Sequence, residues 1–157
     1  MSTTITSAQL VYQHSYNLAD LPFIADASEA FDHFIKDWDF GTIFLQQEAK
    51  VMLLNRGHKI IGIVSIAKGG VHDIVIDPKL VFAAALSGLA SSIVIAHNYT
   101  SGNIRPSYDH INKARQLVEG GNILGIRVID YLVISQSSFH SFAEKGLLNT
   151  PGQNKMR

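Results

Sequence analysis

Apolar residues recur with a helical period in some stretches of the chain and form short runs in others. Residues 26–40 predict an amphipathic helix, with Ser28 as its N-cap just before the acidic Glu29. Residues 49–70 predict two strands joined by the Asn-Arg-Gly-His turn at 55–58. The apolar positions of the predicted helix lie on one helical face: Ala30, Phe31, Phe34, Ile35 and Trp38.

The next segment predicts a short strand and then a helix. Residues 71–76 have the composition of a strand. Residues 77–90 predict a helix, because Asp77 is a good N-cap and Pro78 suits the first helical position. The small side chains of that helix indicate that it lies close against a sheet.

Two continuous apolar runs, residues 91–97 and 125–135, are typical of strands buried on both faces. Residues 106–121 between them predict a helix. Ser107 is its expected N-cap, and the Gly-Gly pair at 120–121 is expected to end it.

The ends of the chain complete the predicted order of elements. Residues 7–16 alternate weakly and predict an N-terminal strand, and residues 138–148 predict a last short element. The resulting order, β-α-β-β-β-α-β-α-β, predicts an α/β fold with a mixed sheet flanked by helices. We expect one domain over residues 1–148, with a strand-helix extension at its N-terminus, and a frayed tail at 149–157.

Composition narrows the function classes. Lysine plus arginine balance aspartate plus glutamate at 13 each, so the charge gives no support for nucleic-acid binding. The chain has no cysteine, so a zinc ion would need histidine or carboxylate ligands. It also has no signal-peptide pattern and no apolar run of membrane-spanning length. We therefore expect a cytoplasmic protein without a membrane partner.

The stretch "AHNYTSGNIRPSYDH" at 96–110 contains the candidate chemistry. A catalytic zinc site needs three protein ligands, an open position for water and a nearby carboxylate as general base. Two histidines at i and i+2 at a strand end supply two ligands on one side, and a carboxylate in the next helix supplies a third. Here the corresponding residues are His97 and Tyr99, followed by Asp109 and His110.

This stretch resembles the JAB/MPN (JAMM) metalloprotease-like family, and within it the RadC-like branch. In that branch a strand ends in His-Asn-His-Pro-Ser-Gly and is followed by a Pro-Ser-x-x-Asp helix start, which "HNYTSGNIRPSYDH" matches without a gap. The resemblance extends to "LLNRGHKIIGIVSIAKGG", "DPKLVFAAAL", "ASSIVIAHN", "LGIRVIDYLVIS" and "SFAEKGLL". It implies the cytidine-deaminase-like architecture of the family and a zinc-dependent peptidase or isopeptidase ancestry.

The resemblance also implies a role for each position of the motif. His97 takes the place of the first metal histidine, and Ser107 that of the serine that supports the transition state. Tyr99 stands where the family has its second metal histidine, and His110 where it has its metal aspartate. A phenol with a pKa of about 10 is a poor zinc ligand. Two imidazole nitrogens then remain where three ligands are needed.

The family's glutamate base aligns with Gln47, and Glu48 is adjacent. Since neighbours on a strand face opposite sides, only one of the two can serve the site. Replacing a general base by glutamine removes about 10²- to 10⁴-fold of rate. Which residue faces the site is left open by the sequence.

Three interpretations follow. The first is a non-catalytic pseudo-enzyme with no cofactor, which binds an unknown protein or small molecule in a cleft. The second is a zinc-dependent hydrolase with a rearranged ligand set. The third is a DNA-binding protein associated with DNA repair, which the branch name implies and the charge does not support. An exposed strand edge would also allow a homodimer. The residues expected to line the cleft of the first interpretation are Asn98, Tyr99, Ser101, Tyr108 and Asp109; the second would use His97, His110, Asp109 and Glu48.

Overall fold

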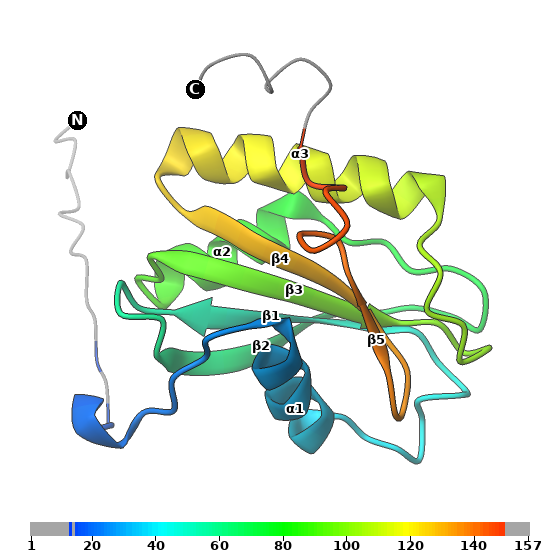
Figure 1. The fold of residues 1–157 in the computed structure, drawn as a ribbon, viewed down its shortest axis with the longest axis horizontal. Helices are drawn as coiled ribbons and strands as arrows, with labels where there is room; N and C mark the ends of the chain where they lie inside the picture. The colour runs from blue at the N-terminus through cyan, green and yellow to red at the C-terminus, as the bar shows by residue number, and fades with distance from the viewer. Residues whose placement is uncertain (1–12, 14, 150–157) are drawn as a thin grey trace, which may run out of the picture.

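The computed structural model of the chain describes residues 13 and 15–149 (Figure 1). A mixed sheet with the strand order β2-β1-β3-β4-β5 forms its centre. β3 and β4 are parallel, and the other neighbouring pairs are antiparallel. The strands are β1 (Glu48–Leu54), β2 (Ile60–Lys68), β3 (Ser92–Asn98), β4 (Arg127–Ile134) and β5 (Phe139–Ser141). The predicted α/β class with a mixed sheet is confirmed.

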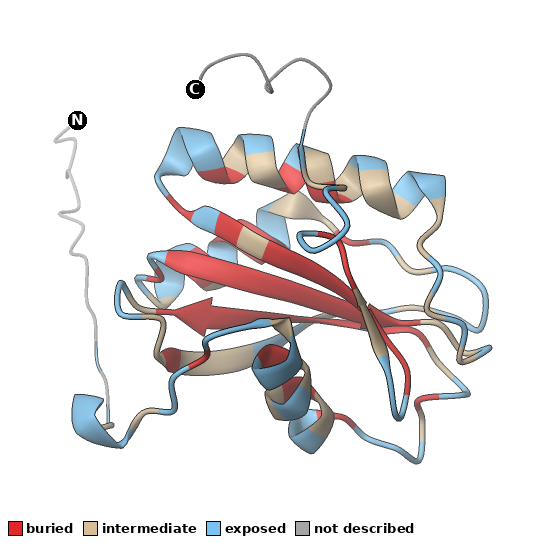
Figure 2. Ribbon diagram, viewed as in Figure 1, coloured by how far each residue is buried: buried red, intermediate tan, exposed pale blue. Residues whose placement is uncertain are grey.

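Helices cover both faces of this sheet (Figure 1). The helical elements are η1 (Leu18–Asp20), α1 (Ala27–Asp37), α2 (Pro78–Ser87) and α3 (Tyr108–Leu124). α1 packs on one face, and α2 and α3 pack on the other. The central strands are therefore buried along their length, as Figure 2 shows. None of the helices in the part of the chain described here is long and apolar enough to cross a membrane.

Strand alternation divides the core into two clusters. On β1 and β3 the odd-numbered apolar residues, such as Val51 and Ile95, pack with α2 and α3. The even-numbered ones, such as Met52 and Val94, pack with α1. The same alternation decides which polar side chains reach which face at the ends of these strands.

The predicted ends of two helices are wrong by a few residues. The N-cap of α1 is Asp26 rather than Ser28, because the Asp26 carboxylate accepts from Glu29 N at 2.9 Å while the Glu29 carboxylate accepts from Ala25 N at 2.7 Å. α3 passes through the Gly-Gly pair at 120–121 and ends at Gly125, whose φ is 70°.

Close packing explains the glycine pair inside α3. A Cβ on Gly121 would lie 2.2 Å from the Ile126 carbonyl oxygen, and one on Gly120 would lie 2.9 Å from the Phe82 ring. These glycines therefore allow α3 to approach β4 and α2, and do not end the helix.

Other predictions have different outcomes. Residues 71–76 form no strand, whereas α2 begins at Pro78 with Asp77 as its N-cap, as predicted. The predicted strand at 7–16 lies mostly outside the described residues, and so does the predicted tail at 149–157. Residues 138–148 form β5 and a series of turns.

Candidate functional site

A cleft of about 500 Å³ lies where β3 ends and α3 begins. We call it the β3–α3 cleft. Its walls include polar side chains from the turn before β1, from the loop after β3 and from the first turn of α3. The motif residues among them are Gln47, Tyr99, Ser101, Ser107, Asp109 and His110.

His97 lies at the end of β3 and is completely buried. Its ring stacks on the His110 ring at a centroid distance of 4.1 Å and an angle of 25°. Tyr99 and Tyr131 meet it edge-on, at 4.9 and 5.4 Å. Neither ring nitrogen has a hydrogen-bond partner among the residues that the structure describes. Burial, and then the neighbouring His110, hold the pKa of His97 well below 6.5, so the ring is neutral at pH 7.

His110 belongs to a local hydrogen-bond network. Its Nδ1 lies 2.7 Å from Ser107 Oγ and 2.9 Å from the Tyr99 hydroxyl. Ser107 N donates to the Tyr99 hydroxyl at 3.1 Å, and His110 N donates to Ser107 Oγ at 3.2 Å. Ser107 is therefore the N-cap of α3, as predicted. Burial lowers the pKa of His110, while Asp109 opposes the shift.

The structure places Gln47 and Glu48 on opposite faces of the sheet. Gln47 lines the β3–α3 cleft and is 4% exposed, and its Oε1 has no donor within the described part of the chain. Glu48 Oε1 accepts from Ser65 Oγ at 2.7 Å and lies 3.7 Å from Lys50 Nζ. Lys50 in turn pairs with Asp37 at the end of α1. The sequence left open which of the two residues faces the site. Gln47 does, and strand alternation turns Glu48 toward α1, so the interpretation that used Glu48 in this cleft is wrong.

Asn98 was expected to line the cleft, and this prediction is also wrong. Its Nδ2 donates to the carbonyls of Ile43 and Gln46 at 2.7 and 3.1 Å, and its Oδ1 accepts from Glu48 N at 2.8 Å. Asn98 is one residue after His97 and therefore faces the α1 side, where it holds the turn before β1 against β3. Tyr108 is 74% exposed and also lies outside the cleft lining.

The residues present do not fit the zinc ion that the resemblance implies. An imidazole lone pair lies in the plane of its ring, so two stacked rings direct their nitrogens into separate, nearly parallel planes. A shared zinc needs both nitrogens at about 2.0–2.1 Å and pointing at one centre. In the described residues, no group of three or more histidine, aspartate or glutamate side chains is placed to hold a metal. His110 Nδ1 is, in addition, already engaged by Tyr99 and Ser107.

Sequence reasoning did not identify Tyr131 as part of this region. Tyr131 lies on β4, is completely buried, and its hydroxyl has no hydrogen-bond partner in the described chain. Burial, and then Tyr99, raise its pKa well above 10.0. The sequence feature that could have indicated it is a tyrosine inside the apolar run at 125–135, which forms the strand after the helix that begins at the motif.

Comparison with known proteins agrees with this architecture. The family model described as RadC-like JAB domain matches residues 24–147. A UPF0758 protein from Salinibacter ruber is 34% identical over 125 residues, which cover 80% of this chain and 51% of that protein. One from Porphyromonas gingivalis is 39% identical over 110 residues, 69% of this chain and 48% of that protein. One from Clostridium beijerinckii is 38% identical over 103 residues, 66% of this chain and 45% of that protein.

This chain thus spans about half the length of the curated relatives that it matches. The family match extends from the segment before α1 to the turns after β5, and so includes the whole sheet and its helices. The chain belongs to the RadC-like JAB domain family.

Proposed function

We propose that this chain is a non-catalytic binding module, in which the β3–α3 cleft receives a partner protein segment or a small molecule. One observation carries the proposal: Tyr99, Ser107 and His110 bond to one another where the resemblance implies metal ligands. These bonds occupy the Nδ1 atom of His110. The His97 ring is stacked on the His110 ring, so the nitrogens of the two rings do not point at a common metal position.

The position of the general base supports the same proposal. Gln47 faces the cleft where the family's glutamate would act, and an amide does not accept a proton at neutral pH. A hydrolase would therefore lack both its metal-activated water and its base.

Gln47 also supports the binding role. A buried acceptor without a donor costs about 1–3 kcal/mol, and buried polar atoms in native proteins are nearly always paired. Gln47 Oε1 is such an acceptor, and it lies on the wall of the cleft. A ligand with an N–H or O–H group directed at Gln47 would supply the missing donor.

The test is zinc content by elemental mass spectrometry, after purification without chelator or histidine tag and a challenge with added zinc. We expect far less than one zinc per chain. The matched variant carries Gln47→Glu, Tyr99→His and His110→Asp, which restore the residues that the resemblance implies. It should retain about one zinc per chain, because three ligands then converge with an open position.

A wild-type chain that keeps about one zinc, and loses it on His97→Ala, would contradict the proposal and revive the hydrolase with a rearranged site. Binding is examined separately by NMR, through the side-chain amide resonance of Gln47 during a fragment screen. Fragments with amide or hydroxyl donors should shift it, and Gln47→Met should abolish their binding. No hit among such fragments would count against the binding role.

A further inference from the structure

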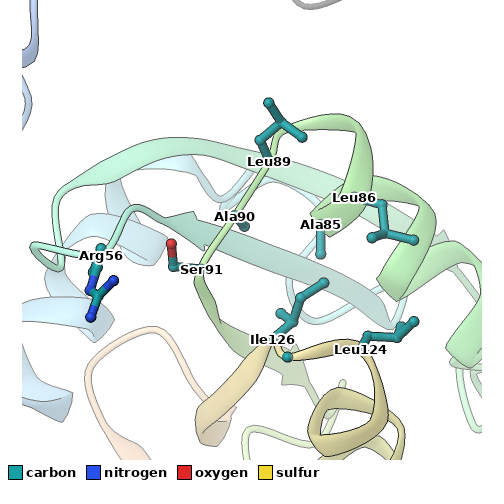
Figure 3. A pocket seen from close by; sticks show the side chains of 9 residues that line it. Arg56, Ala85, Leu86, Leu89, Ala90, Ser91, Leu124 and Ile126 are labelled. Carbon is teal, nitrogen blue, oxygen red and sulfur yellow. The ribbon is translucent and has the colours of Figure 1, made fainter. Parts of the chain in front are cut away.

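A second cavity, of about 490 Å³, lies at the other end of β3, away from the β3–α3 cleft. It is formed where α2 and α3 end, beside the start of β3 and the turn between β1 and β2. Figure 3 shows leucine side chains on one side of this cavity and Arg56 on the other. Leu86, Leu89 and Leu124 are 50, 51 and 45% exposed. We call these three leucines and Arg56 the helix-end face.

Leu89 has a backbone conformation that a leucine rarely adopts. Its φ is 50°, in the left-handed region just after α2. Ala90 N bonds to the Ala85 carbonyl at 2.9 Å, which closes the helix end with the kind of turn that normally uses glycine. α3 ends beside it with Gly125, whose φ is 70°. The Leu89 side chain is thus held at a strained position and yet remains half exposed in the isolated chain.

The charges on the helix-end face are complementary to one another. The ends of α2 and α3 carry the negative poles of their helix dipoles, although backbone N–H groups of the following turns already cap the Ala85 and Gly121 carbonyls. Neither last turn contains a basic residue. Arg56 is the charged residue in the described lining. Its side chain has no hydrogen bond or ion pair with any described residue.

We propose that the helix-end face is a two-fold interface between two copies of this chain. In a two-fold contact, one side of the face meets the other side of the same face on the partner. The Arg56 side of each copy would then meet the helix ends of the other, and the leucines would pack together at the centre. A purely apolar partner would instead leave Arg56 and both helix ends without counterparts.

Packing in such a dimer would give the exposed leucines the apolar environment that they lack in the single chain. It would also explain a leucine at the position of Leu89, where glycine would be the less strained residue. The proposal does not depend on the cleft, since the two regions lie at opposite ends of β3.

Sedimentation velocity of the full chain over about a hundredfold range of concentration tests it, because association follows mass action. We expect a reversible dimer. Leu89→Gly should weaken dimerisation by about tenfold or more. The melting temperature of its monomer should be unchanged or higher, since glycine accepts the positive φ. Arg56→Glu should also weaken the dimer, and Arg56→Lys should retain part of the affinity.

Leu45→Ser is the matched control, because Leu45 is 64% exposed and lies outside the helix-end face. It should dimerise as the wild type does. A chain that stays monomeric throughout the range overturns the proposal, and so does a dimer that neither Leu89→Gly nor Arg56→Glu weakens. If Leu89→Gly does not fold, Leu124→Lys decides the question, since it changes only a half-exposed side chain.

Discussion

His97 and Asn98 are neighbours at the end of β3, but among the described residues the asparagine side chain has hydrogen-bond partners and the histidine side chain has none. Asn98 bonds to two carbonyls and one backbone N–H on the α1 side of the sheet. Both ring nitrogens of His97, on the other side, lack partners among the described residues. The start of β1, the strand beside β3, shows the same contrast. Glu48 accepts a hydrogen bond from Ser65, whereas Oε1 of the preceding Gln47 has no donor in the described chain.

The contrast separates paired polar groups, which maintain the fold, from unpaired ones, of which Gln47 Oε1 borders the β3–α3 cleft while the His97 nitrogens are buried behind its wall. A fully paired buried network stabilises one arrangement of the chain, whereas unpaired buried atoms reduce stability. Native proteins depart from the rule that buried polar atoms are paired mainly at functional sites. The α1 side should therefore respond to substitution through stability. The cleft side should tolerate substitution and change in binding.

Asn98→Ala should have the largest effect on stability. It leaves Glu48 N and the carbonyls of Ile43 and Gln46 without their partner, so the free energy of unfolding should fall by about 3 kcal/mol. Urea denaturation followed by circular dichroism measures this change. His97→Leu is the matched control. His97 is the preceding residue, its side chain is just as buried, and it has no hydrogen bond to a described residue.

The control should change the free energy of unfolding by less than about 1 kcal/mol, or increase it, since similar volume is kept and two unpaired nitrogens are removed. Equal losses for the two variants would show that the hydrogen bonds of Asn98 do not distinguish the two sides.

Lys50→Met should have the next largest effect. The Lys50 side chain is 9% exposed, bonds to Asp37 at 2.6 Å and lies beside Glu48. Its loss leaves the buried Glu48 carboxylate without its cation, so the free energy of unfolding should fall by about 2 kcal/mol. Asp37→Asn should cost less than about 1 kcal/mol, because the Asp37 side chain is 48% exposed. A larger loss for Asp37→Asn than for Lys50→Met would refute this order.

Some helix ends could be predicted from the sequence and others could not. The start of α2 was predictable because Asp77 and Pro78 act on their own helix. The end of α3 was not, because the pair at 120–121 packs against residues distant in sequence or beyond the helix. Ser28 and Asp26 are both residue types that cap helices, and the bonds from Glu29 N to the Asp26 carboxylate and from Ala25 N to the Glu29 carboxylate favour the earlier one.

The candidate site also depends on contacts between segments that are distant in the sequence. Strand alternation predicted that only one of Gln47 and Glu48 could face it, but not which one. That depends on the cross-strand pairing of Ala49 with His97, a contact between segments almost fifty residues apart. The stacking of His97 on His110 likewise depends on how α3 packs over β3, which residue spacing does not define.

The pH dependence of stability should distinguish His97 from its neighbours. Its pKa is lowered well below 6.5 in the folded chain, mainly by burial, so below pH 6.5 the unfolded chain binds a proton that the folded chain does not. The free energy of unfolding should therefore fall as the pH is lowered, by up to about 1.4 kcal/mol per pH unit, until the folded pKa is reached. Above pH 6.5 this contribution is constant.

Chemical denaturation of the wild type and of His97→Leu between pH 7.5 and pH 5 measures the difference. His110, whose pKa is also lowered, and Asp130, whose pKa is raised by burial, remain in both proteins. The raised pKa of Asp130 acts in the opposite direction, because the folded chain then holds that proton more tightly. The variant should show the shallower slope. Parallel curves would mean that His97 takes up its proton in the folded chain.

Gln47→Met should have a small effect on stability and the clearest effect on binding. Methionine has nearly the same length and volume as glutamine, so the wall of the cleft keeps its shape while the unpaired Oε1 is removed. The free energy of unfolding should rise by about 1 kcal/mol, which equilibrium denaturation can detect. A cleft that binds through this acceptor should at the same time lose affinity for donor-bearing fragments. A fall in stability would instead indicate that Gln47 is already paired in the free protein, and Gln47 would then belong with Asn98 among the residues that maintain the fold.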